Sequence, residues 1–172
     1  MGRDKALLPF HGQPLASYVA RTVADAAETA VLVGDEARLT GLGYPVIPDL
    51  YPGEGPLGGI LTALDHTTAD WNLLTACDMP GLTAAFLAGL LTAAEESGAD
   101  ILMPAGPSGL PEPLCAVYRR TGRDPIARAF AGGVRKVTAA FAGLRTVQLS
   151  VPELKPFQNV NTPQDWAGYA AG

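Results

Sequence analysis

Short apolar runs alternate with amphipathic helical segments along almost the whole chain, and this alternation restricts the possible folds most strongly. Segment 14–28 carries apolar residues at three- and four-residue spacing, which predicts a helix. Segments 30–33 and 73–77 are short and largely apolar, as strands are when both faces of their sheet are covered. Strands that alternate with helices join through right-handed crossovers. The sequence therefore predicts an α/β fold of three αβα layers, with a mostly parallel sheet in the middle.

The other elements continue the pattern. We expect strands at 45–47, 101–103, 114–118 and 146–151, and helices at 36–40, 57–64, 86–94, 124–130 and 134–144. A last helix is expected to begin at Thr162, because threonine suits the N-cap and Pro163 the first turn. The chain has 172 residues and shows no linker or repeat, so we expect a single domain over 1–172.

Charge and composition argue against several classes of protein. The formal net charge of -5 argues against a nucleic acid or an anionic membrane as the main partner. No apolar run approaches the roughly 18 residues that a membrane span needs. Cys77 and Cys115 provide neither a disulfide framework nor a zinc motif, so we expect buried, unreactive thiols in a cytoplasmic protein.

Ligands of open α/β sheets bind outside the carboxyl ends of the strands, so the residues that follow the predicted strands are the candidate site. Asp78 closes segment 73–77, and Pro80 prevents the strand from continuing. Its carboxylate either offers hard oxygen to a magnesium ion held with substrate phosphates or caps the following turn. Asp49 ends the strand at 45–47 in the same way, and Gly34 ends the strand at 30–33.

Three further groups each have a functional and a structural interpretation. Glycines in segment 53–59 let the backbone approach a ligand, but the segment matches neither the P-loop nor the dinucleotide fingerprint, and by itself it is better explained as a turn-rich connection. Arg3 and Lys5 either bind a triphosphate through their positive charges or form a solvated turn. Asn159 and Asn161 either orient an acceptor or a metal-bound water, or make local cap bonds.

Five motifs occur in a characteristic order and spacing. They are Met1-Gly2-Arg3-Asp4-Lys5-Ala6-Leu7-Leu8, Pro48-Asp49, Gly55-Pro56-Leu57-Gly58-Gly59-Ile60, Cys77-Asp78-Met79-Pro80 and Asn159-Val160-Asn161-Thr162-Pro163-Gln164-Asp165. In this order they resemble the molybdenum cofactor guanylyltransferases of the MobA family, over nearly the whole chain. The resemblance implies a Rossmann-like nucleotide-diphospho-sugar transferase fold and a Mg²⁺-dependent reaction. GMP would pass from GTP to molybdenum-bearing molybdopterin, with release of pyrophosphate.

The resemblance also implies roles for individual residues. GTP would contact Arg3, Lys5, Gly34, Asp49 and Asp78, and molybdopterin would contact Gly55, Gly58, Asn159 and Asn161. Catalysis would depend on Lys5, Asp78 and Asn161, with the magnesium ion on Asp78. Molybdenum-insertion proteins and molybdoenzyme chaperones are the implied protein partners.

The chain departs from the family pattern at its N-terminus. Family members have a strand and the loop Leu-Ala-Gly-Gly-x-Ser-x-Arg before Met-Gly-x-Asp-Lys, and this sequence does not include them. Loss of a central strand exposes sheet edges, so we expect the strand and loop to precede Met1 in the natural protein. Two alternatives stay open: a related nucleotidyltransferase that uses CTP or another phosphorylated acceptor, and a non-catalytic protein that binds molybdopterin or a partner on the same scaffold.

Overall fold

The computed structural model describes residues 5–152. The α-helices are α1 (Leu15–Ala27), α2 (Glu36–Leu39), α3 (Pro56–His66), α4 (Ala84–Ser97) and α5 (Arg123–Ala131), and the 3-10 helices are η1 (Lys5–Leu7), η2 (Arg120–Gly122) and η3 (Val137–Phe141). The strands are β1 (Pro9–Phe10), β2 (Gln13–Pro14), β3 (Leu32–Gly34), β4 (Val46–Pro48), β5 (Trp71–Thr75), β6 (Ile101–Ala105), β7 (Cys115–Arg119) and β8 (Thr146–Ser150). No helix in this part of the chain has the length and apolar character of a membrane span.

Within residues 5–152 the strands form three sheets. The largest has the order β5-β7-β6-β8, while β3 pairs with β4 and β1 pairs with β2. β7 is antiparallel to both β5 and β6, and β6 is parallel to β8. Three of the four strands of the main sheet therefore run in one direction, and β3 and β4 are also parallel to each other. The predicted mostly parallel sheet is confirmed, with β7 as its reversed strand.

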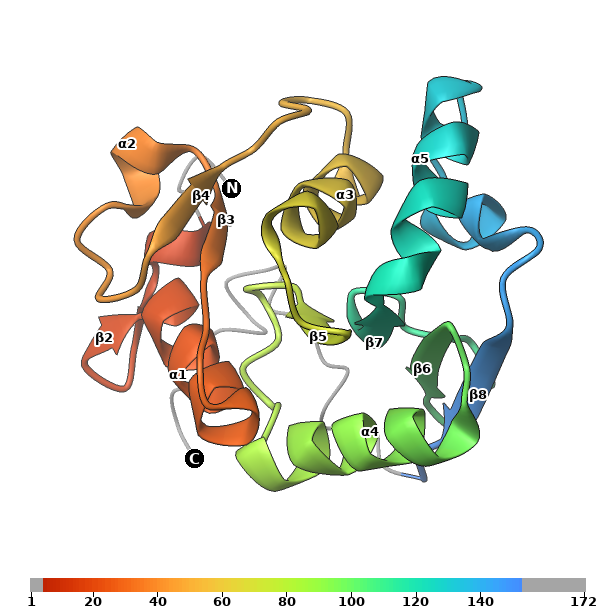
Figure 1. The fold of residues 1–172 in the computed structure, drawn as a ribbon. Coiled ribbons are helices and arrows are strands. Elements are labelled where there is room, and N and C mark those ends of the chain that lie inside the picture. The colour runs from red at the N-terminus through yellow and green to blue at the C-terminus, as the bar shows by residue number, and fades with distance from the viewer. Residues whose placement is uncertain (1–4, 153–172) are drawn as a thin grey trace.

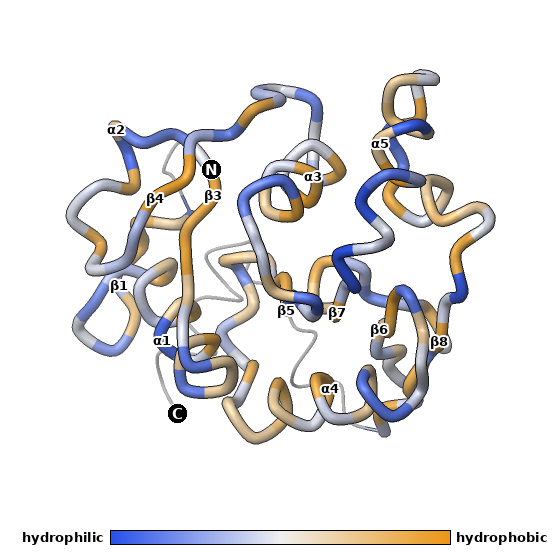
Figure 2. Tube along the Cα trace, in the orientation of Figure 1, coloured by the Kyte–Doolittle hydropathy of each residue, from blue (hydrophilic) through white to orange (hydrophobic). Residues whose placement is uncertain are grey.

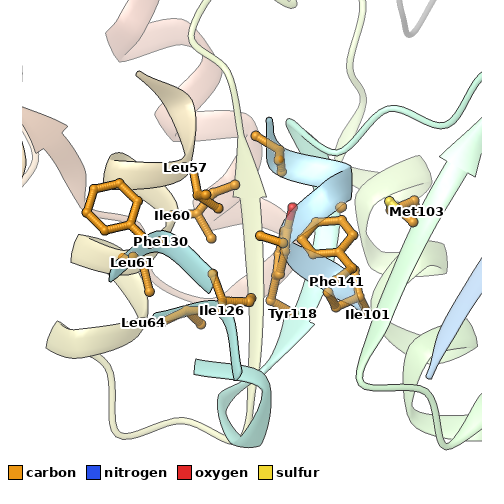
Figure 3. Packing of buried hydrophobic residues seen from close by; sticks show 13 residues of the cluster. Leu57, Ile60, Leu61, Leu64, Ile101, Met103, Tyr118, Ile126, Phe130 and Phe141 are labelled. Carbon is orange, nitrogen blue, oxygen red and sulfur yellow. The ribbon is translucent and has the colours of Figure 1, made fainter. Parts of the chain in front are cut away.

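Helices cover both faces of the main sheet (Figure 1). Ile101 and Met103 of β6 belong to the cluster beneath α3, α5 and η3, which Figure 3 shows from close by. Leu102 belongs to a second cluster with Leu87 and Leu90 of α4, on the opposite face. Successive side chains of a strand point to opposite faces, so one apolar strand contributes to both clusters. The predicted three-layer αβα arrangement is confirmed.

β3 and β5 are less buried than their apolar sequences predicted. All five residues of β5 and all three of β3 are half-buried, although β3 is strongly hydrophobic in Figure 2. Among the described residues, β5 pairs only with β7 and β3 only with β4. Each strand thus has one edge that no other strand of residues 5–152 pairs with.

Two segments differ from the sequence prediction, and one expected element is not described. The helix expected at 134–144 is only the short η3, because Lys136 has extended backbone and Gly143 turns the chain with φ 83°. The β1–β2 hairpin was not predicted, and its turn places His11 and Gly12 at φ 45° and 78°. Positive φ at both turn residues matches the twist of a hairpin. The helix expected at Thr162 lies outside the described residues.

Candidate active site

Lys5 and Asp78, which are 73 residues apart in the chain, meet beyond the carboxyl end of β5. The Lys5 Nζ atom donates a hydrogen bond to Asp78 Oδ2 over 3.5 Å. The lysine side chain is 37% exposed and the aspartate side chain 18%. The pair is thus open to solvent on one side, where an anionic ligand would reach the ammonium group.

The backbone on either side of Asp78 is firmly held. Before it, the Ala76 N–H donates to the Leu114 carbonyl over 2.7 Å, which continues the pairing of β5 with β7. After it, the Met79 side chain is 1% exposed and packs in the cluster against α4. The hydrogen bond of Ala76 and the burial of Met79 hold the turn between these two residues. The carboxylate of Asp78 therefore has a defined position at the sheet edge.

Gly34 and Asp49 form a second group, at the ends of β3 and β4. The Asp49 N–H donates to the Gly34 carbonyl over 3.2 Å. Asp49 Oδ1 accepts hydrogen bonds from the Tyr51 N–H and the Thr62 hydroxyl, each over 3.0 Å. A Cβ atom on Gly34 would lie 2.9 Å from Leu39 Cδ1. Both residues therefore have structural reasons for their identity, in addition to any contact with a nucleotide.

The glycine-rich loop after β4 is attached to α5. The Tyr51 ring packs edge-on against Phe130, with centroids 4.9 Å apart, and Arg135 Nε donates to Glu54 Oε2. Gly55 precedes α3 with φ 78°, a conformation that favours glycine. A Cβ atom on Gly58 would lie 2.9 Å from Tyr51 Cβ, so this glycine lets the loop pack on α3.

Three predicted site residues, Arg3, Asn159 and Asn161, lie outside the described residues. Cys115 is buried as predicted, and this burial, with the nearby negative charge of Glu112, raises its thiol pKa to about 12. Cys77 differs from the prediction because it is half-exposed.

The oxygen donors at this edge fit one kind of metal binding. Between residues 5 and 152, no three His, Cys, Asp or Glu side chains come together as a metal cage. Asp78 offers a single carboxylate. Magnesium is commonly held by one or two carboxylates together with substrate phosphates and water, whereas zinc and calcium require more protein ligands. The residues present therefore fit a magnesium ion that arrives with a nucleotide.

A hollow at the other flank of the main sheet was not predicted from the sequence. Its volume is about 450 Å³, and its lining includes Met103 of β6, Phe141 of η3 and Gln148 of β8. Pro111, from the loop between β6 and β7, also lines it. The glycines and prolines of segment 104–113, directly after a buried strand, were the available signal for a structured loop at this edge.

Comparison with known proteins gives matches that span the described site. The family described as MobA-like NTP transferase domain matches residues 1–147. The probable molybdenum cofactor guanylyltransferase of Deinococcus radiodurans is 34% identical, over 96% of this chain and 85% of the relative. The molybdenum cofactor guanylyltransferase of Burkholderia vietnamiensis is 32% identical, over 98% of this chain and 88% of the relative.

Solved structures share the fold. Molybdopterin-guanine dinucleotide biosynthesis protein A from Archaeoglobus fulgidus superposes with a TM-score of 0.81 at 29% identity, over 99% of this chain and 90% of the other. The 2-C-methyl-D-erythritol 4-phosphate cytidylyltransferase from Thermus thermophilus superposes with a TM-score of 0.75 at 18% identity, over 97% of this chain and 92% of the other. The second likeness extends to the fold alone.

Proposed function

The chain belongs to the MobA-like NTP transferase family, and we therefore propose that it is a molybdenum cofactor guanylyltransferase, which transfers GMP from GTP to molybdopterin carrying molybdenum. A phosphate oxygen of molybdopterin bonds to the α-phosphorus of GTP. The bond from that phosphorus to the bridging oxygen breaks, pyrophosphate leaves with the electron pair, and the guanine dinucleotide cofactor forms. One observation carries this proposal: the pairing of Lys5 with Asp78 at the carboxyl end of β5.

Phosphoryl-type transfer needs positioning and charge neutralisation more than a covalent nucleophile. The Lys5 ammonium is placed to bind the phosphates of GTP and to stabilise the negative charge that develops on the departing pyrophosphate. Asp78 orients the ammonium through the 3.5 Å contact with Nζ. The partial exposure of both groups leaves room for phosphates beside them.

Asp78 is also the residue that would hold Mg²⁺, together with oxygens of the GTP phosphates. When bound there, the ion supplies positive charge that neutralises the phosphates. This local charge accounts for how a protein with a formal net charge of -5 accepts two anionic substrates.

The other predicted contacts belong to the same proposal. Gly34 and Asp49 lie at adjacent strand ends and would contact the nucleotide. Arg3, outside the described residues, is assigned to the nucleotide phosphates together with Lys5. Gly55 and Gly58, at the start of α3, serve the molybdopterin side. Asn159 is assigned to molybdopterin binding, and Asn161 is assigned both to molybdopterin binding and to catalysis. Cys77 and Cys115 form no disulfide, which supports a cytoplasmic location, where molybdenum-insertion proteins and molybdoenzyme chaperones would supply substrate and receive product.

The experiment that tests the function combines purified chain, Mg²⁺, molybdenum-loaded molybdopterin and one nucleoside triphosphate at a time. We expect pyrophosphate release and dinucleotide formation with GTP, and at most slow release with CTP, ATP or UTP. Faster transfer with CTP would favour the cytidylyltransferase alternative, which the shared fold makes the relevant competitor. Binding of molybdopterin without transfer from any nucleotide would favour the non-catalytic alternative.

A further inference from the structure

The hollow at the β6–β8 flank has an apolar floor and a polar rim. Met103 and Phe141 are 3% and 6% exposed and form the floor, and Met103 lies at the margin of the buried cluster in Figure 3. Gln148 pairs in register with Met103, so both side chains stand on the face that η3 covers. Thr138 and Thr146 add hydroxyl groups beside the Gln148 amide.

The chemistry of this lining selects for a neutral, flat ligand. None of the lining residues carries a charge. A phosphate would lose water here without gaining a cationic partner, which is unfavourable. A thioether and an aromatic ring suit the face of a heterocycle, since sulfur and ring atoms both pack favourably on π-systems. The Gln148 amide can donate and accept side by side, as a 2-amino-4-oxopyrimidine edge requires.

Both guanine and pterin have that 2-amino-4-oxopyrimidine edge, and the position of the hollow distinguishes them. Gly34 and Asp49, the proposed nucleotide contacts, lie at the ends of β3 and β4, and this pair of strands is on the β5 side of the main sheet (Figure 1). The hollow lies over β6 and β8, at the opposite end of the main sheet. Asp78 follows β5, and β5 lies between the β3–β4 sheet and the β6–β8 flank in Figure 1.

The loop between β6 and β7 connects the hollow to the segment that carries Asp78. Pro111 lines the hollow and bridges to Ala105 of β6. Three residues later, the Leu114 carbonyl accepts the hydrogen bond of the Ala76 N–H, two residues before Asp78. Between them, Glu112 holds the loop, because its N–H donates to the Pro104 carbonyl and its Oε1 accepts from the Leu114 N–H. The β6–β7 loop therefore joins one side of the hollow to the end of the strand that leads to Asp78.

We propose that this hollow binds the pterin ring system of the acceptor substrate, with Met103 and Phe141 against the ring and Gln148 on its aminopyrimidinone edge. The inference rests on the proposed guanylyltransferase function for the identity of the acceptor. It assigns the acceptor heterocycle to residues of β6, η3 and β8 that none of the sequence motifs contains. The phosphate of the acceptor then extends along the β6–β7 loop toward Asp78.

The test uses free pterin as the probe and follows its fluorescence as the protein is added, with and without GTP and Mg²⁺. Ala139→Trp fills the mouth of the hollow from an exposed position on η3, so the fold should tolerate it. Ala85→Trp is the matched control, because Ala85 is exposed on α4, across the sheet. We expect Ala139→Trp to abolish pterin binding and Ala85→Trp to leave it unchanged. Gln148→Leu should weaken binding about tenfold through the lost amide contacts.

Different outcomes separate this inference from the proposed function. Equal pterin binding by the wild type and Ala139→Trp would overturn the inference. Displacement of pterin by GTP, with weaker GTP binding in Ala139→Trp, would assign the hollow to guanine instead. Unchanged KM for molybdopterin in an active Ala139→Trp enzyme would overturn the inference and leave the function intact. Pterin binding that Ala139→Trp abolishes, in a wild type that transfers no GMP, would support the hollow and refute the function.

Discussion

Replacement of Asp78 by Asn tests whether the Lys5–Asp78 pair contributes mainly to catalysis or mainly to the stability of the fold. The side chains are 18% and 37% exposed, and Nζ and Oδ2 are 3.5 Å apart. Partly exposed pairs of this kind contribute about 0.2–1 kcal/mol, because water screens them and long side chains lose freedom. We therefore expect the free energy of unfolding to fall by about 1 kcal/mol at most, which is about 2–4 °C in Tm for a chain of this size. The rate of GMP transfer should fall about 10²–10³-fold, as when a preorganised electrostatic group is removed from a transition state.

Urea unfolding and initial rates of pyrophosphate release measure the two effects on the same samples. Asp70→Asn is the matched control: Asp70 Oδ2 lies 3.1 Å from Arg119 Nε, their side chains are 52% and 39% exposed, and Asp70 precedes the opposite end of β5. It should show a similarly small loss of stability and an unchanged rate. Lys5→Met should resemble Asp78→Asn, and the double variant should be little slower than either, because groups that act as a unit are not additive.

Two results would refute this assignment. A wild-type rate in Asp78→Asn would exclude Asp78 from the chemistry and from magnesium binding. A loss of several kcal/mol in the free energy of unfolding would instead make the pair structural, since water-screened pairs do not contribute that much.

Three further predictions concern packing and ionisation. Gly58→Ala should lower the free energy of unfolding by about 1–3 kcal/mol in urea titrations, because the new Cβ atom would lie 2.9 Å from Tyr51 Cβ. Gly59, on the same helix, is the control: a Cβ atom there would meet nothing within 4 Å. Gly59→Ala should therefore raise the free energy of unfolding by about 0.5–1 kcal/mol. In the native protein an alkylating reagent should modify Cys77 while Cys115 reacts only on unfolding, as peptide mass mapping would show. The free energy of unfolding should decrease as the pH rises above 9.0, the ordinary thiol pKa, because the unfolded Cys115 thiol then ionises while the buried one keeps its proton up to a pKa of about 12. In urea titrations from pH 8 to 10.5 that proton should contribute a slope of up to about 1.4 kcal/mol per pH unit. The buried Tyr118 hydroxyl, whose pKa is also raised by burial, should steepen the decrease toward the top of that range, and a flat profile would contradict both.

Helices with strong local signals were predictable. The apolar spacing of segment 14–28 corresponds to α1, and Leu57, Ile60, Leu61 and Leu64 all lie on the buried face of α3. Such spacing depends only on the 3.6-residue period of the helix. η3 was overestimated because Lys136 and Gly143 interrupt the helical backbone at each end of a segment that has the right apolar spacing.

Strand neighbours were not predictable from local patterns. Nothing within segment 114–118 indicates that β7 lies between β5 and β6 and runs opposite to them. An apolar strand has the same composition in either direction, because pairing energy depends on partners distant in sequence. The burial of β5 was overestimated for the same reason, since it depends on neighbours and not on the strand itself.

In the candidate site, too, the positions of single residues were predictable and their contacts were not. Asp78 and Asp49 were identifiable because each follows an apolar strand, where ligands of α/β sheets bind. Their surroundings were not: Asp49 Oδ1 is engaged by Thr62 and Tyr51, whereas Asp78 meets Lys5. The Tyr51 contact is a local turn bond two residues along the chain, but the contacts with Thr62 and Lys5 join residues 13 and 73 positions apart, and no spacing rule specifies them.

The sequence by itself determined the alternation of helices and strands, the family, and which residue types stand at strand ends, because these depend on local periodicity and on motifs that are read directly. Only the tertiary structure decided which of those residues meet. It joined Lys5 to Asp78 across 73 positions, and it formed a hollow from β6, η3 and β8 that no motif marks. Side-chain proximity across a sheet is set by strand order and packing, and both arise from the balance of contacts over the whole chain.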